Sequence, residues 1–214
     1  MFVKRLLRVK ENWLDEMNEI EFQKYKTRGV DYHWRQVSKR SVMSYNAFVH
    51  ARYMLVVDHV NKILDNYYKN VEETFRILDM GCGDGVLLYL LSKNIKNYNI
   101  ELNGVDLSDI AVKTAMTKFE QKGVENKFFF KTETVYNTSF KDGTFDIIIS
   151  SDVIEHLNEP EIFLKEVKRS LKDGGFLVIG TPIKYTEKPL DSMHVYEFFP
   201  REFEELLKKI LRQC

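Results

Sequence analysis

Residues 77–85 read ILDMGCGDG, in which an apolar run ends at Asp79 and glycines follow at positions 81, 83 and 85. Glycine tolerates the backbone angles of a tight turn and lets the chain approach a ligand closely. The next six residues, VLLYLL, fit a helix whose free N–H groups would face an anionic part of that ligand. The stretch therefore predicts a strand, a ligand-binding turn and a helix, in that order.

Short apolar runs alternate with helical stretches from residue 75 onward. FDIIIS (145–150) and FLVIG (176–180) are apolar throughout, as expected for central strands of a sheet that is covered on both faces. We expect an α/β fold with a Rossmann-like, doubly wound and mostly parallel sheet. The run FFF (128–130) is expected to be buried. The predicted strands are 75–80, 100–106, 127–131, 145–150 and 176–180, and the predicted helices are 86–93, 108–122, 160–171 and 201–211.

Residues 1–72 show helical periodicity without strand-like alternation. We expect two helical runs there, near 6–20 and 44–68, which would form an N-terminal helical cap or lid. The polar and aromatic segment between them, residues 27–41, is predicted to be the most mobile part of the chain. A ligand-binding domain would then occupy residues 73–214.

The composition is that of an ordinary globular protein: 214 residues, 44% hydrophobic, with 32 basic and 32 acidic side chains. No stretch reaches the roughly 18 apolar residues that a membrane-spanning helix needs. Cys82 and Cys214 cannot form a disulfide framework or a metal cluster of usual spacing. We therefore predict a cytoplasmic protein without a metal site or a transmembrane segment.

A second acid, Asp106 in GVDLS, closes the next predicted strand, where a carboxylate can accept hydrogen bonds from both ribose hydroxyls. The ligand is therefore expected to be a nucleoside. Dinucleotide-binding proteins place a third glycine where this chain has Val86, and Asp79 would repel a pyrophosphate. A cationic nucleoside such as S-adenosylmethionine, with its ammonium and sulfonium groups, fits better.

Three further segments accompany these motifs: SFKDGTFDIIISSDVIEHL (139–157), LKDGGFLVIGTP (171–182) and HVYEFFPREFEELL (194–207). Together they resemble the class I S-adenosylmethionine-dependent methyltransferases, most closely the small-molecule "type 11" branch, over about residues 75–207. The resemblance implies direct transfer of a methyl group to a small molecule, or to a small group on a lipid or glycan. It also implies a set of cofactor contacts: Asp79, Gly81, Cys82 and Gly83 around the methionyl part, Asp106 at the ribose, Leu107 against the adenine, and Ser151 through its backbone.

The sequence departs from the family pattern in two places. Thr134 stands where the family usually has an acid that binds the adenine amino group, and Glu133 lies one residue earlier, so either residue is a candidate for this contact. The two final strands of the family sheet, strands 6 and 7, are missing from the pattern. FLVIG would then form an apolar edge, which folded proteins avoid. A shortened sequence or a homodimer that covers this edge would account for it.

The acceptor side of the site is less specific. His156, after the fourth predicted strand, is a candidate catalytic base or a histidine that fixes its loop. His194 and Tyr196, in the later loop DSMHVYEFFP, are candidate substrate contacts. So is Trp34, within a predicted lid of residues 32–35, while Arg52 is a candidate partner for the methionyl carboxylate.

Two other functions stay open from the sequence. One is a module that binds the cofactor but is catalytically idle and serves a partner. The other is an RNA methyltransferase, which the basic excess of residues 1–70 keeps open. A net charge of zero and the lack of an aromatic and basic groove motif argue against nucleic acid as a partner.

Overall fold

The computed structural model describes residues 25, 27–38, 43–68, 72–186, 191 and 193–211. The first predicted helical run, near residues 6–20, and Cys214 lie outside these residues. Within them, no helix is both long enough and apolar enough to cross a membrane.

Five strands form one sheet in the order β3-β2-β1-β4-β5, and every neighbouring pair is parallel. This confirms the predicted α/β fold and its Rossmann-like sheet. The strand bounds are β1 (Thr74–Met80), β2 (Asn99–Asp106), β3 (Lys127–Thr132), β4 (Phe145–Ser151) and β5 (Leu171–Gly180).

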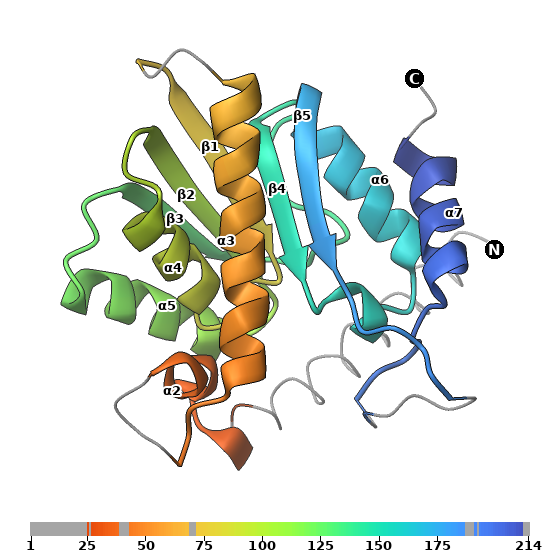
Figure 1. Ribbon diagram of the computed structural model, residues 1–214, viewed down its shortest axis with the longest axis horizontal. Helices are drawn as coiled ribbons and strands as arrows, with labels where there is room; N and C mark the ends of the chain where they lie inside the picture. The colour runs from red at the N-terminus through yellow and green to blue at the C-terminus, as the bar shows by residue number, and fades with distance from the viewer. Residues whose placement is uncertain are drawn as a thin grey trace, which may run out of the picture.

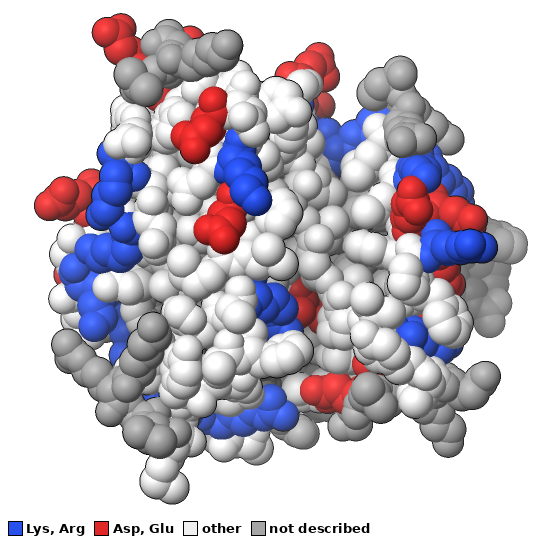
Figure 2. Space-filling model, in the orientation of Figure 1, with Lys and Arg blue, Asp and Glu red and all other residues white. Residues whose placement is uncertain are grey.

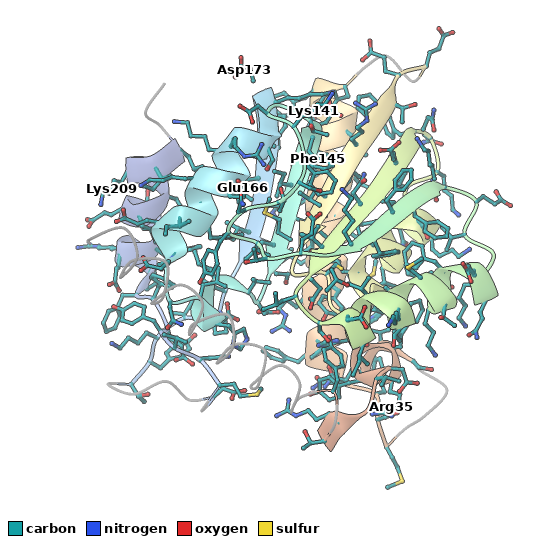
Figure 3. The ribbon with its side chains drawn as sticks, turned by 180° about the vertical axis from the view of Figure 1, so that it is seen from behind. Arg35, Lys141, Phe145, Glu166, Asp173 and Lys209 are labelled. Atoms are coloured by element: carbon teal, nitrogen blue, oxygen red, sulfur yellow. The ribbon has the colours of Figure 1, made fainter. Side chains whose placement is uncertain are left out.

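Helices cover both faces of the sheet (Figure 1). One layer contains α3 (Ala47–Tyr67), α4 (Val86–Asn94) and α5 (Asp109–Gln121). The other contains α6 (Pro160–Ser170) and α7 (Pro200–Leu211). Seen from behind, α6 and α7 lie side by side, with Glu166 labelled on the first and Lys209 on the second (Figure 3).

The pleat of the central strands divides the apolar side chains between the two layers. In β4, Ile147 and Ile149 pack with α3 and α4, whereas Ile148 packs with α6 and α7. All three side chains are fully buried. A continuous apolar run is therefore what a strand between two helical layers requires.

The segment predicted to be mobile contains a short helix, α2 (Tyr32–Val37). Its Trp34 is buried, and the indole packs against the ring of Tyr89 of α4 with a centroid separation of 4.7 Å. The prediction of a mobile segment missed this helix, because it is held by a tertiary contact rather than by its own periodicity. In Figure 1, α2 lies at the end of the sheet toward which the arrows of β4 and β5 point.

The edge strands differ from expectation in two ways. β5 begins at Leu171, directly after α6, because Leu171 pairs with Phe145 of β4 ahead of the predicted core of the strand. The prediction that FFF is buried was wrong: the side chain of Phe129 is 44% exposed, and Phe128 and Phe130 are only partly buried, because β3 is an edge strand. Phe176 of β5 packs against Tyr67 of α3, so this edge is partly covered within the described part of the chain.

Candidate functional site

A cavity of about 340 Å³ opens where β1, β2 and β4 end. Its volume is within the range of small-ligand pockets, about 300–1,000 Å³, and the carboxyl ends of parallel strands are where α/β proteins bind ligands. Most residues proposed from the sequence line this cavity, namely Arg52, Asp79, Gly81, Cys82, Gly83, Asp106, Leu107, Thr134, Ser151, His156 and His194.

The glycine turn after β1 forms one wall of the cavity. Gly81 has a φ of 84°, and a Cβ there would collide with the side chain of Val153. The N–H groups of Gly81 and Cys82 both donate to the carbonyl oxygen of Val105, over 2.8 and 2.9 Å. The turn is therefore fastened to the end of β2, and only glycine fits at its start.

Asp106 is oriented by two backbone donors. The N–H of Gly83 donates to its Oδ2 over 2.7 Å, and the N–H of Ser108 donates to its Oδ1 over 2.9 Å. Each carboxylate oxygen has a second lone pair, so both can also accept a hydrogen bond from a ligand. This geometry suits a pair of neighbouring ribose hydroxyls.

Asp79, at the end of β1, is a second buried carboxyl in the same wall. Burial raises the pKa of Asp79 to about 8, and the neighbouring charge of Asp106 adds to the rise. No Lys or Arg of the described residues forms an ion pair with Asp79. Because a bound cation would favour its ionised form, the site fits the ammonium and sulfonium groups of S-adenosylmethionine.

Cys82 lies in the turn, but its environment disfavours a thiolate. Burial raises the pKa of the Cys82 thiol well above its ordinary value, and the charges of Asp106 and Asp79 act in the same direction. Reactive cysteines have lowered pKa values. Cys82 is therefore a small apolar wall residue.

Helix α2 closes the cavity over the glycine turn. The backbone N–H of His33 donates to Oδ2 of Asp84 over 2.9 Å, and Nε1 of Trp34 donates to the carbonyl oxygen of Asp84 over 2.6 Å. Tyr32 and His33 line the cavity, whereas Trp34 packs behind it. Two residues of the predicted lid thus line the cavity, whereas Trp34 holds α2 against the glycine turn and is not part of the cavity wall.

The opposite wall follows β4 and contains the one-turn helix η1 (Ile154–His156). Nδ1 of His156 donates to the carbonyl oxygen of Met193 over 2.9 Å, and the imidazole rings of His156 and His194 are 5.0 Å apart. Burial raises the pKa of the fully buried Glu155 to about 7, and the nearby Asp152 also raises it.

Some of the remaining candidate residues line the cavity and others lie outside it. Both carboxylate oxygens of Glu133 accept hydrogen bonds from Ser139, so Thr134 is the residue on the cavity wall. Tyr196 lies outside the cavity and donates to Glu202 over 2.5 Å. Arg52 lines the cavity and pairs with Asp152 over 2.7 Å.

Sequence reasoning missed some residues of the wall, among them Tyr25, Arg28, Asp152 and Asp191. Asp152 could have been proposed from the sequence, since it lies two residues after the fourth predicted strand. Its φ of 58° places its backbone in a conformation that is rare outside glycine. Tyr25 and Arg28 come from segments with no motif, and only the fold brings them to the site.

A parallel sheet of this order, with a glycine turn after β1 and a buried acid after β2, defines a nucleoside-binding protein of the Rossmann-like class. Residues 78–179 match the family described as "Methyltransferase domain". Over these residues the chain is similar to the class I S-adenosylmethionine-dependent methyltransferases.

The sequence is similar to those of several named methyltransferases. Norajmaline N-methyltransferase of Rauvolfia serpentina is 30% identical over 155 residues, which are 72% of this chain and 50% of that protein. The ubiquinone biosynthesis O-methyltransferase of Caulobacter sp. (strain K31) is 31% identical over 110 residues, 51% of this chain and 41% of that protein. The chain thus spans about half or less of the length of these relatives.

A solved structure supports the fold. The crystal structure of an S-adenosylmethionine-dependent methyltransferase from Aquifex aeolicus matches with a TM-score of 0.57 and 24% identity. The match covers 72% of this chain and 78% of that one. At this identity the likeness shows a shared fold.

Proposed function

We propose that this chain binds S-adenosylmethionine in the cavity and transfers its methyl group to a small molecule. One observation carries the proposal: a single cavity joins a carboxylate-lined glycine turn to a wall of histidines. The first wall holds the buried acids Asp79 and Asp106, and the second holds His156 and His194. A methyl donor and an acceptor would thus lie side by side.

The donor half consists of the glycine turn, Asp79, Asp106 and Leu107. Bound there, S-adenosylmethionine supplies an electrophilic methyl group on a sulfonium that leaves readily. The chain's contribution is mainly to align the reactants and exclude water. Asp106 and the turn fix the nucleoside, Asp79 offers a negative charge to the amino-acid end, and α2 shields the cavity from solvent.

The acceptor half opens toward a second hollow, which shares Arg52, Asp152 and His194 with the first. Phe48 and Tyr185 line this hollow, and their side chains are 84% and 76% exposed. Exposed aromatic side chains at the mouth of a cavity suit an acceptor with an apolar body. A small molecule with an apolar ring system and one reactive oxygen or nitrogen fits this combination.

The surface charge also favours a small acceptor over RNA. The net charge of the whole sequence is zero. On the face shown in Figure 2, blue basic groups form a short run at the left edge and elsewhere stand near red acidic ones, with wide white areas between them. Nucleic-acid binding relies on a continuous basic surface that neutralises phosphates.

Cofactor turnover against a panel of acceptors tests the proposal. S-adenosylhomocysteine release would be measured with S-adenosylmethionine and apolar amines, phenols and activated carbon acids, with mixed RNA as a separate arm. We expect release with at least one apolar small molecule and none with RNA. Binding of the cofactor without release in any arm would favour the idle module, and release with RNA alone would favour the RNA methyltransferase.

A further inference from the structure

Three side chains of the acceptor wall form a cluster that methyl transfer does not require. Glu155, His156 and His194 each offer one oxygen or nitrogen atom, and these atoms lie within 4.8 Å of one another. Two of the residues come from η1 and the third from the loop before α7. Two histidines and one carboxylate form the ligand set of many metal sites with open coordination positions.

The hydrogen bonds of the two histidines resemble those of metal-binding histidines. Nδ1 of His194 donates to Oε1 of Glu197 over 2.7 Å, and Nδ1 of His156 donates to the carbonyl oxygen of Met193 over 2.9 Å. Metal-bound histidines usually donate their other N–H to a carboxylate or a backbone carbonyl. Because Nδ1 is the donor in both rings, Nε2 is the nitrogen with a lone pair that could bind a metal.

Glu155 supplies the independent observation. Its side chain is fully buried; Oε2 accepts a hydrogen bond from Thr181 over 3.1 Å, whereas Oε1 has no hydrogen-bond partner among the described residues. A buried carboxylate oxygen without a partner is costly. By contrast, the buried Glu166, labelled in Figure 3, accepts from Thr138 and pairs with Arg169 over 2.6 Å.

The loop that carries His194 is tied to Glu155 by its backbone. The N–H groups of Val195 and Tyr196 donate to the carbonyl oxygen of Glu155 over 2.8 and 3.1 Å. The cluster is thus held together before any ion arrives, which favours tight binding. All three side chains line the cavity of the candidate site.

We propose that Glu155, His156 and His194 bind one divalent first-row transition-metal ion. Imidazole nitrogens and a carboxylate select such ions over Mg²⁺, which prefers oxygen ligands. The coordination positions that the protein leaves open face the cavity. An acceptor hydroxyl would bind there, and the metal would lower its pKa. This assignment of a hydroxyl acceptor rests on the proposed function, whereas the metal site does not.

Metal titration of the full chain tests the site directly. The chain is freed of metal with a chelator, exchanged into buffer and titrated with Co²⁺, followed by its visible absorption, and with Zn²⁺ in a calorimeter. We expect one ion per chain. His194→Gln and Glu155→Gln should each weaken binding by about 100-fold or more, and Glu197→Gln by about 10- to 100-fold.

The exposed His59 of α3 provides the matched control, and His59→Gln should leave the affinity unchanged. Far-ultraviolet circular dichroism checks each variant for folding; if Glu155→Gln does not fold, His194→Gln decides alone. No ion bound by the wild-type chain, or equal affinity in the wild type and His194→Gln, would overturn the proposal. S-adenosylhomocysteine binding is measured separately with chelator present, so that failure of the metal site and failure of the proposed function are told apart.

Discussion

The backbone N–H of Gly83 donates a hydrogen bond of 2.7 Å to Oδ2 of Asp106, which lies 23 residues later in the chain. This bond joins the glycine turn after β1 to the acid at the end of β2. The two motifs therefore act as one unit, and the turn orients the carboxylate toward the cavity. A change in either residue should affect both.

Replacement of Asp106 by Asn should weaken S-adenosylhomocysteine binding by about 1–3 kcal/mol, or about 5- to 150-fold in Kd. The amide would turn a donor toward the N–H of Gly83 or of Ser108, and it could no longer accept from both ribose hydroxyls. Calorimetric titration measures the change. Asp109→Asn is the control, since this exposed acid at the start of α5 lies outside the cavity; an equal loss in both variants would contradict the assigned role.

The pKa of Asp79, about 8 in the folded chain against an ordinary 3.8, gives stability a defined pH dependence. At a pH between these two pKa values, the carboxyl of Asp79 keeps its proton in the folded chain and has lost it in the unfolded chain. The contribution of Asp79 to stability is therefore complete below about pH 4 and lost by about pH 8. Urea unfolding measures the free energy of unfolding at about pH 5 and about pH 8. We expect this free energy to fall between the two pH values in the wild type, and to fall less in Asp79→Asn. Identical pH dependence in the two proteins would show that the carboxyl ionises normally.

The same carboxyl should make cofactor binding release a proton. The ammonium group of S-adenosylhomocysteine, bound beside Asp79, would favour the ionised form of this carboxyl, so at neutral pH binding would lower its pKa and free the proton. Titrations of S-adenosylhomocysteine in buffers of different protonation enthalpy measure this release. We expect it in the wild type and not in Asp79→Asn; release that persists in the variant would assign the proton to another group.

Replacement of Gly85, the residue before α4, by Ala should destabilise the fold more than the same change at another glycine of positive φ. Its φ is 79°, and a Cβ there would lie 2.7 Å from the Cβ of Ala115. Gly174 has a similar φ of 75° and nothing within 4 Å of a Cβ. Gly174→Ala should cost about 1–2 kcal/mol from the left-handed backbone alone. Gly85→Ala should cost about 1–3 kcal/mol more from overpacking, as measured by urea unfolding.

Trp34 should control how firmly α2 covers the cavity. Trp34→Phe keeps an aromatic ring but removes the indole N–H that donates to Asp84, which should cost about 1–3 kcal/mol of docking free energy. Amide hydrogen exchange in residues 32–37 should then accelerate about 5- to 150-fold. Tyr67→Phe, at the exposed end of α3, is the control, and unchanged exchange in Trp34→Phe would show that α2 is held by other contacts.

The sheet could be predicted because its signals are local. The apolar runs of β4 and β5 and the glycine turn each mark an element within a few residues. Asp106 could be placed next to the turn because the carboxyl ends of neighbouring parallel strands meet at one edge of the sheet. The donor half of the site follows from these elements.

The acceptor half depends on contacts between distant segments, which no local pattern encodes. His156 and His194 meet because the loop before α7 returns to η1, and Trp34 turns away because Asp84 accepts its N–H. The prediction that the chain lacks a metal site rested on the spacing of its cysteines alone. The proposed ligands include no cysteine and come together only in the folded chain.

Titration of the folded chain with S-adenosylhomocysteine, in parallel with NAD⁺, most directly tests whether the cavity is a site for an adenosyl amino acid rather than for a dinucleotide. We expect saturable binding of one S-adenosylhomocysteine per chain and no saturable heat with NAD⁺. Saturable binding of NAD⁺, or no heat with S-adenosylhomocysteine, would contradict the site described above.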